Sequence, residues 1–108
     1  MKEKQITVIL VEPNGLPVVK VIENELSVLQ GLVGGYIECI RQDGYDIIIN
    51  EEGKLEGLEL NFLIYDGLDY VAGNAIFAGV DYDEGEFKSL TAEQIAVIYR
   101  NFRKVDKN

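Results

Sequence analysis

The segment spanning residues 70–80 constrains the fold of this chain more than any other part of the sequence. It reads YVAGNAIFAGV, carries no formal charge, and contains two glycines and three alanines. A strand that is apolar on both faces belongs in the middle of a sheet, and small side chains let neighbouring elements approach its backbone. A helix is the alternative, but glycine and β-branched residues are poor helix formers. We therefore predict one central β-strand over residues 70–80.

The rest of the sequence predicts an α+β fold in which about five strands form a mostly antiparallel sheet. Residues 6–11 and 18–22 are aliphatic segments separated by a turn rich in proline, asparagine and glycine. Residues 36–42 and 45–50 flank Asp43-Gly44, which is a signal for a tight β-hairpin. Residues 55–65 are compatible with either a short helix or a strand. With 108 residues, the whole chain 1–108 is expected to be a single domain.

Two helices are predicted to pack on this sheet. The first is expected to have Asn24 as its N-cap and Glu25 in its first turn, and to end at a glycine pair. The second follows Thr91, which forms a capping box with Gln94. The apolar stripe of this second helix is expected to reach Val105, and basic residues accompany its C-terminal end: Arg100, Arg103, Lys104 and Lys107.

The charge of the chain limits the partners it is expected to bind. Its formal net charge is −9 and its isoelectric point is near 4.4. Direct binding to nucleic acids is not expected, because lysine and arginine side chains drive that binding. The acidity favours either a basic protein partner or nothing more than solubility.

Several classes of chemistry are disfavoured by the composition. The chain contains no histidine, which removes the commonest general base, the Ser-His and Cys-His pairs, and most zinc sites. We therefore expect no enzyme activity, no metal site and no cofactor. The single cysteine, Cys39, excludes an intramolecular disulfide and is expected to be buried and inert. No apolar run approaches a membrane span and no signal peptide is recognisable, so we predict a cytoplasmic protein without membrane association.

Residues 81–86 form an acidic segment that partly resembles a calcium-binding loop. Asp81 and Asp83 stand where the first oxygen ligands of such a loop would lie. The sixth and twelfth positions hold Glu86 and Ala92, although a calcium loop requires glycine and a bidentate glutamate there. A solvated loop that binds no metal is therefore the favoured interpretation.

Two asparagines lie within apolar stretches, and a buried amide must find hydrogen-bonding partners. They are Asn61 and Asn74. Structural asparagines bonded to the backbone are the simpler explanation. The alternative is a ligand-binding pocket lined by these amides and by three tyrosines, so that the candidate site comprises Asn61, Asn74, Tyr36, Tyr65 and Tyr70.

Three blocks of sequence together carry a resemblance to a known family. The first combines VEP at 11–13, IEN at 22–24 and VGGYIE at 33–38; the second combines NEEGKL at 50–55 with LELN at 58–61; the third combines AGNAIFAG at 72–79 with GEFKSLT at 85–91. Over nearly the whole chain, these blocks resemble the domain of unknown function 3846 family, small proteins of bacteria, phages and mobile elements.

The resemblance implies a compact α+β domain and a mobile-element setting, and it implies no catalytic residue. Members of the family often follow a Leu-Pro-Leu-Asn segment with arginine. Here Glu59 replaces the proline and Phe62 replaces the arginine, so no role of that arginine is carried over to this chain.

The leading functional hypothesis is a non-catalytic accessory or binding protein of a phage or mobile element. One alternative is an acidic inhibitor that mimics DNA and occupies a host nucleic-acid-binding protein, in which case carboxylates should follow one exposed surface. The other is a binder of a small nucleotide-like ligand, with a pocket of tyrosines, amides and glycine backbone.

Overall fold

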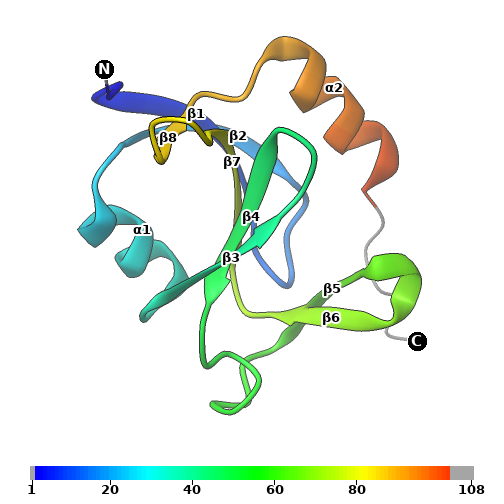
Figure 1. The fold of residues 1–108 in the computed structure, drawn as a ribbon. Helices are drawn as coiled ribbons and strands as arrows, with labels where there is room; N and C mark the ends of the chain where they lie inside the picture. Colours follow the sequence, from blue (N-terminus) through cyan, green and yellow to red (C-terminus); the bar gives the residue numbers. More distant parts are fainter. Residues whose placement is uncertain (1, 103–108) are drawn as a thin grey trace.

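The structure, a computed structural model, describes residues 2–102 (Figure 1). These residues form two α-helices, one six-stranded sheet and a separate two-stranded sheet. Each described strand pairing is antiparallel, which confirms the predicted α+β class. The predicted extension of the last helix to Val105, and the basic residues Arg103, Lys104 and Lys107, lie outside the described residues.

The main sheet has the strand order β2-β1-β7-β4-β3, and β8, which is off this path, pairs with the C-terminal part of β7. Its strands are β1 (Gln5–Val11), β2 (Val18–Glu23), β3 (Ile37–Arg41), β4 (Tyr45–Asn50), β7 (Ala75–Asp81) and β8 (Glu86–Lys88). The predicted pairing of the first two strands and the hairpin across Asp43-Gly44 are confirmed.

A separate two-stranded ribbon pairs β5 (Leu60–Ile64) with β6 (Asp69–Ala72), and η1 (Tyr65–Gly67) joins the two strands. We refer to this hairpin as the β5–β6 ribbon. The region that was compatible with helix or strand is therefore a strand over its second half. Turns over residues 51–57 lead into it.

The apolar segment at residues 70–80 is two strands rather than one. β6 ends at Ala72, Gly73 has a φ of 86°, and β7 begins at Ala75. The prediction of one continuous strand is wrong at this point, because a left-handed glycine turns the chain out of one sheet and into the other. The predicted central position in the sheet is confirmed for β7, which is paired with β1 on one side and β4 on the other.

Small residues in this segment allow close backbone approach, as expected. A Cβ atom added at Gly79 would lie 2.7 Å from the carbonyl oxygen of Ser89 and 2.9 Å from that of Lys88. One added at Gly73 would lie 2.7 Å from Cδ1 of Leu58. Glycine at position 79 therefore lets β8 and the segment after it pack directly against the central strand.

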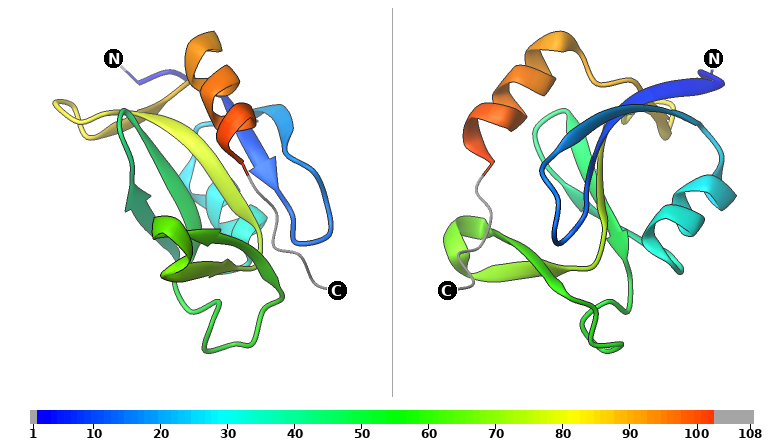
Figure 2. Two further views of the ribbon diagram at one scale, coloured as in Figure 1. Left: turned by 90° about the vertical axis from the view of Figure 1, so that its right-hand side faces the viewer. Right: turned by 180° about the vertical axis from the view of Figure 1, so that it is seen from behind.

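The main sheet separates two hydrophobic clusters, with the two helices on opposite sides (Figures 1 and 2). The cluster on the side of α2 (Ala92–Asn101) and the ribbon includes Ile47, Ile49, Phe62, Val71, Phe77 and Ile98. The cluster on the side of α1 (Leu26–Val33) includes Ile6, Leu29, Val33, Ile48, Ile76 and Ala78. The inner strands β4 and β7 therefore bury both of their faces.

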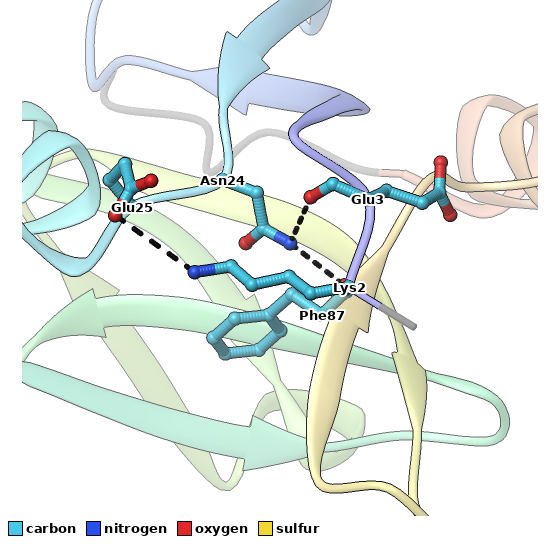
Figure 3. A network of polar contacts seen from close by, with 5 residues as sticks. All are labelled: Lys2, Glu3, Asn24, Glu25 and Phe87. Atoms are coloured by element: carbon cyan, nitrogen blue, oxygen red, sulfur yellow. Dashed lines mark hydrogen bonds and ion pairs between the residues drawn. The ribbon is translucent and has the colours of Figure 1, made fainter.

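Asn24 does not cap α1, which corrects the sequence prediction. Glu25 occupies the N-cap position and makes no side-chain cap bond. The buried Asn24 amide instead donates to the carbonyl oxygens of Glu3 at 2.9 Å and Phe87 at 3.1 Å (Figure 3). The amide thereby connects the N-terminal segment to β8, two parts of the chain that no local sequence signal relates. The helix ends at Gly34, whose φ of 82° confirms the predicted glycine stop.

The capping box of α2 forms as predicted. The backbone N–H of Gln94 donates to Thr91 Oγ1 at 3.1 Å, and the Thr91 N–H donates to Gln94 Oε1 at 2.9 Å. The Gln94 side chain also donates to the carbonyl oxygen of Gly44 at 3.0 Å. One residue therefore both starts the helix and holds it against the β3–β4 hairpin.

Within the described part of the chain, no helix is long and apolar enough to cross a membrane.

Candidate functional site

The five residues of the predicted ligand site do not meet in one place. Tyr36 is 73% exposed just before β3, Tyr65 lies in η1, and Tyr70 lies on β6. Tyr65 lines a pocket of about 380 Å³, and Tyr70 lines a smaller one of about 290 Å³.

Both predicted amides are bonded to the backbone. The fully buried Asn61 donates to the carbonyl oxygens of Val11 and Gly73, each at 2.9 Å. The half-buried Asn74 donates to the carbonyl oxygen of Leu32 at 2.9 Å. These bonds account for the position of both amides without a ligand, as the simpler interpretation of the sequence proposed.

The larger pocket has a volume of about 380 Å³ and lies between the main sheet, the β5–β6 ribbon and the end of α2. Aromatic side chains from four elements and from the end of α2 line it: Tyr45, Phe62, Tyr65, Phe77 and Phe102. Its polar lining residues include Gln42, Asp66 and Asn101. The pocket falls within the size range of small-molecule sites.

The aromatic rings form a connected series along the pocket. The ring centroids of Tyr45 and Phe77 are 6.0 Å apart, and those of Phe62 and Phe77 are stacked at 5.8 Å. Phe62 and Phe102 meet edge to face at 5.3 Å. Because these rings hold one another in preferred orientations, the apolar wall is built before any ligand arrives.

The rim of the pocket is formed by a strained turn. Tyr65 and Asp66 have φ values of 52° and 55°, and Gly67 continues the left-handed conformation at 88°. A residue other than glycine costs about 1–3 kcal/mol in such a conformation. The fold keeps this strain in two consecutive residues, and both of them line the pocket.

The pocket is poor in charge. Asp66 is the one carboxylate among its described lining residues, and none of these is lysine, arginine or cysteine. Burial, followed by the negative charge of Asp43, raises the pKa of Tyr45 above its ordinary value, so its hydroxyl stays neutral. The lining therefore offers aromatic side chains, two amides and the neutral phenol of Tyr45.

The smaller pocket, about 290 Å³, lies between β3, β4, β6 and the 51–57 turns. Its charged lining residues are Glu38, Glu51, Lys54 and Asp69. Lys54 pairs with Asp69, and its Nζ atom lies 4.6 Å from the ring centroid of Tyr70. The hydrogen bond from Lys54 lowers the pKa of Asp69. The remaining acidic groups give this pocket a negative character.

The acidic loop is organised by its own backbone. Oδ1 of Asp81 accepts hydrogen bonds from the N–H groups of Asp83 and Glu84, both at 3.1 Å. Over residues 2–102, no group of three His, Cys, Asp or Glu side chains is placed to hold a metal ion.

Cys39 is exposed on the edge strand β3, which corrects the expectation of a buried thiol. Alternation along β3 turns the next residue, Ile40, toward the core and leaves the Cys39 side chain outside. Partial desolvation, followed by the charges of Asp46 and Glu38, raises the pKa of the Cys39 thiol. The thiol is therefore accessible but held in its less reactive protonated form.

Most residues of the larger pocket were not singled out from the sequence. Phe62, Phe77 and Phe102 carry the ordinary pattern of core positions, and nothing local distinguishes a core aromatic residue from one that lines a cavity. The Asp66-Gly67 dipeptide is of a kind that is typical of turns. The left-handed conformation of this turn, which brings Tyr65 to the rim, is not indicated by any local sequence pattern.

The fold and pockets define a small α+β domain with an aromatic pocket at the junction of its two sheets. The protein belongs to the family described as domain of unknown function DUF3846, whose model matches residues 6–103. This match confirms the family resemblance inferred from the sequence. Neither a curated protein nor a solved structure matches the chain.

Proposed function

We propose that this protein is a non-catalytic binding protein whose larger pocket accepts a small, planar, uncharged molecule of the nucleobase or nucleoside type. The aromatic residues that converge on the pocket carry this proposal, and the half-buried Tyr45 and the exposed Tyr65 are rings that a ligand can reach. Stacking on aromatic faces is worth about 1–3 kcal/mol per base and does not depend on base identity. The amides of Gln42 and Asn101 lie in the same lining and can pair with the polar edge of such a molecule.

The charge of the pocket favours a nucleoside over a nucleotide. A phosphate group needs lysine, arginine or a cluster of backbone N–H groups, and the described lining residues include no cation. Asp66 and the net charge of −9 also repel a phosphate. The sequence suggested a nucleotide-like ligand, and the charge of the pocket restricts this class to ligands without a phosphate group.

The composition of the pocket supports binding without catalysis. General acid–base chemistry needs a proton donor and acceptor of matched pKa within reach of the substrate. The chain has no histidine, and the described lining provides a single carboxylate, Asp66. An accessory role in a phage or mobile element is the setting that the sequence resemblance implies, and the cytoplasm is the location expected from the sequence.

The distribution of carboxylates supports a binding pocket over a DNA mimic. A DNA mimic requires negative charges along one continuous surface. Two of the densest acidic segments, residues 51–59 and 81–86, lie at opposite ends of the molecule (Figures 1 and 2). The acidic residues are therefore spread over separate loops, which favours a binding pocket over a DNA mimic.

The proposal is tested by titrating adenosine, guanosine, cytidine, uridine and indole into the protein, with AMP as the phosphate-bearing counterpart of adenosine. Calorimetry and NMR shift mapping would follow binding. We expect at least one uncharged probe to bind and to shift resonances of Phe62, Tyr65 and Asn101, and AMP to bind more weakly than adenosine. If no probe binds with a Kd below about 1 mM, which corresponds to a binding free energy of about −4 kcal/mol, the proposal is wrong.

A variant separates binding from stability. Tyr65→Gly removes the rim aromatic group and also relieves backbone strain, so the affinity should fall by about tenfold, the loss of one stacking contact, while the free energy of unfolding is unchanged or higher. Tyr36→Ala, at an exposed tyrosine that lines neither pocket, is the matched control and should leave the affinity unchanged.

A further inference from the structure

The β5–β6 ribbon has an outer face that carries exposed apolar side chains. Leu63 and Tyr70 are opposite one another in the strand pairing and are 50% and 40% exposed. Leu68, beside the ribbon tip, is 89% exposed, and Leu55, which shares the smaller pocket with Tyr70, is 88% exposed. We call these four residues the outer ribbon patch.

A patch of this kind is unusual on a solvent-exposed protein surface. Single exposed apolar residues need no explanation, but a contiguous group rimmed by polar residues marks an interaction site. Leu63 and Tyr70 are cross-strand neighbours, and Tyr70 and Leu55 line one concave surface. Leu63, Tyr70 and Leu55 are therefore continuous from the ribbon to the 51–57 turns, and Leu68 directly precedes β6.

The surroundings of the patch are strongly acidic. Residues 51–70 contain six acidic residues and one basic residue, Lys54. The concave surface is lined by Glu38, Glu51 and Asp69, of which Asp69 is paired with Lys54. Among the described ion pairs, Glu38 and Glu51 have no partner.

Lys54 indicates how a cation fits this surface. Its ammonium group lies against the ring of Tyr70 and bonds to the carboxylate of Asp69. An aromatic face beside carboxylates is favourable for lysine and arginine side chains. Further cations could approach Glu38 and Glu51, which lie on the same concave surface.

We propose that the outer ribbon patch is a docking surface for a basic amphipathic segment of a partner protein. Apolar side chains of that segment cover Leu55, Leu63 and Leu68. Its lysine or arginine side chains face Glu38 and Glu51 and complement the negative rim. The same charge repels nucleic acids and anionic membranes, so a basic protein segment is the occupant that this surface selects. The acidic composition of the chain was compatible with a basic protein partner, and the outer ribbon patch is the surface where we propose that this partner binds.

The test uses a synthetic peptide that alternates lysine and leucine, with a second peptide in which glutamate replaces each lysine. Binding to the full chain is measured by fluorescence anisotropy and located by NMR shift mapping. We expect saturable binding of the lysine peptide, with shifts at Leu55, Leu68 and Tyr70. The proposal is overturned if the lysine peptide does not bind, if the glutamate peptide binds as well, or if the shifts lie on another surface.

Matched variants distinguish a specific patch from general attraction to an acidic protein. The doubly substituted variants Leu55→Ser/Leu68→Ser and Glu38→Gln/Glu51→Gln should each weaken binding by about tenfold, as expected for central interface residues. Leu16→Ser and Asp83→Asn/Glu84→Gln change an exposed leucine and an equal charge elsewhere, and should weaken it by less than about twofold. Equal losses of peptide affinity in the patch variants and in the control variants would overturn the proposal. So would a concentration-dependent dimer that blocks the peptide, because a second copy would then be the occupant.

Discussion

The side-chain amide of Asn61 donates a 2.9 Å hydrogen bond to the main-chain carbonyl oxygen of Val11. Val11 is the last residue of β1 in the main sheet, whereas Asn61 belongs to β5 in the ribbon. Both residues are fully buried. The same amide also donates to Gly73, in the turn that leads into the central strand. One side chain therefore joins the two sheets next to the aromatic pocket.

Asn61→Ala should lower the free energy of unfolding by about 1–3 kcal/mol, because two buried carbonyl oxygens lose their donor. Asn74→Ala removes one bond from a half-buried amide and should cost less. Urea denaturation of both variants measures the difference. Wild-type stability in Asn61→Ala would show that the amide does not hold the ribbon to the sheet.

Gly79→Ala should destabilise the protein by about 1–3 kcal/mol, because its methyl group would meet backbone atoms that cannot move independently. Those atoms are the carbonyl oxygens of Ser89 and Lys88, at 2.7 and 2.9 Å from the added Cβ. Gly31→Ala in α1 is the matched control. Nothing lies within 4 Å of its Cβ position, so it should stabilise the helix by up to about 1 kcal/mol. Similar denaturation midpoints for the two variants would contradict the packing of β8 against β7.

Thr91→Ala should cost about 1 kcal/mol, because the N–H of Gln94 loses its acceptor at the start of α2. Thr91→Ser retains the hydroxyl and should stay close to wild type. Thermal and urea unfolding measure both. A loss in Thr91→Ser as large as that in Thr91→Ala would assign the effect to the methyl group instead of the cap.

The ionisation of Asp46 should lower the free energy of unfolding as the pH rises. Burial raises its pKa above the ordinary 3.8, although the hydroxyl of Tyr82 and the charge of Arg41 oppose the shift. Because the folded state then holds the proton more tightly than the unfolded state, the stabilising contribution is present at low pH and is lost as the pH rises above 3.8 through the folded-state pKa.

Asp46→Asn cannot ionise and keeps an oxygen acceptor for Tyr82, which donates to Asp46 Oδ1 at 3.2 Å. The stability of this variant relative to wild type should therefore increase from acidic to neutral pH. Urea unfolding at a series of pH values measures it. A constant difference across the series would mean that Asp46 titrates alike in both states.

The sequence by itself determined the features that depend on neighbouring residues. The Thr91–Gln94 capping box, the glycine stop at Gly34 and the hairpin across Asp43-Gly44 all formed where local patterns predicted them. Each depends on backbone geometry and hydrogen bonds within a few residues. The α+β class followed, because the positions of these elements limit how apolar faces can be buried together.

Only the tertiary structure decided which distant residues meet. Asn24 resembled an N-cap, but a carbonyl more than sixty residues away, that of Phe87, competes for its amide. The apolar segment at 70–80 was divided between two sheets at Gly73, a choice that depends on partners rather than on propensity. The aromatic pocket likewise required Tyr45, Phe62 and Phe102 to converge from separate elements. Contacts of this kind are set by packing over the whole chain, so no local pattern encodes them.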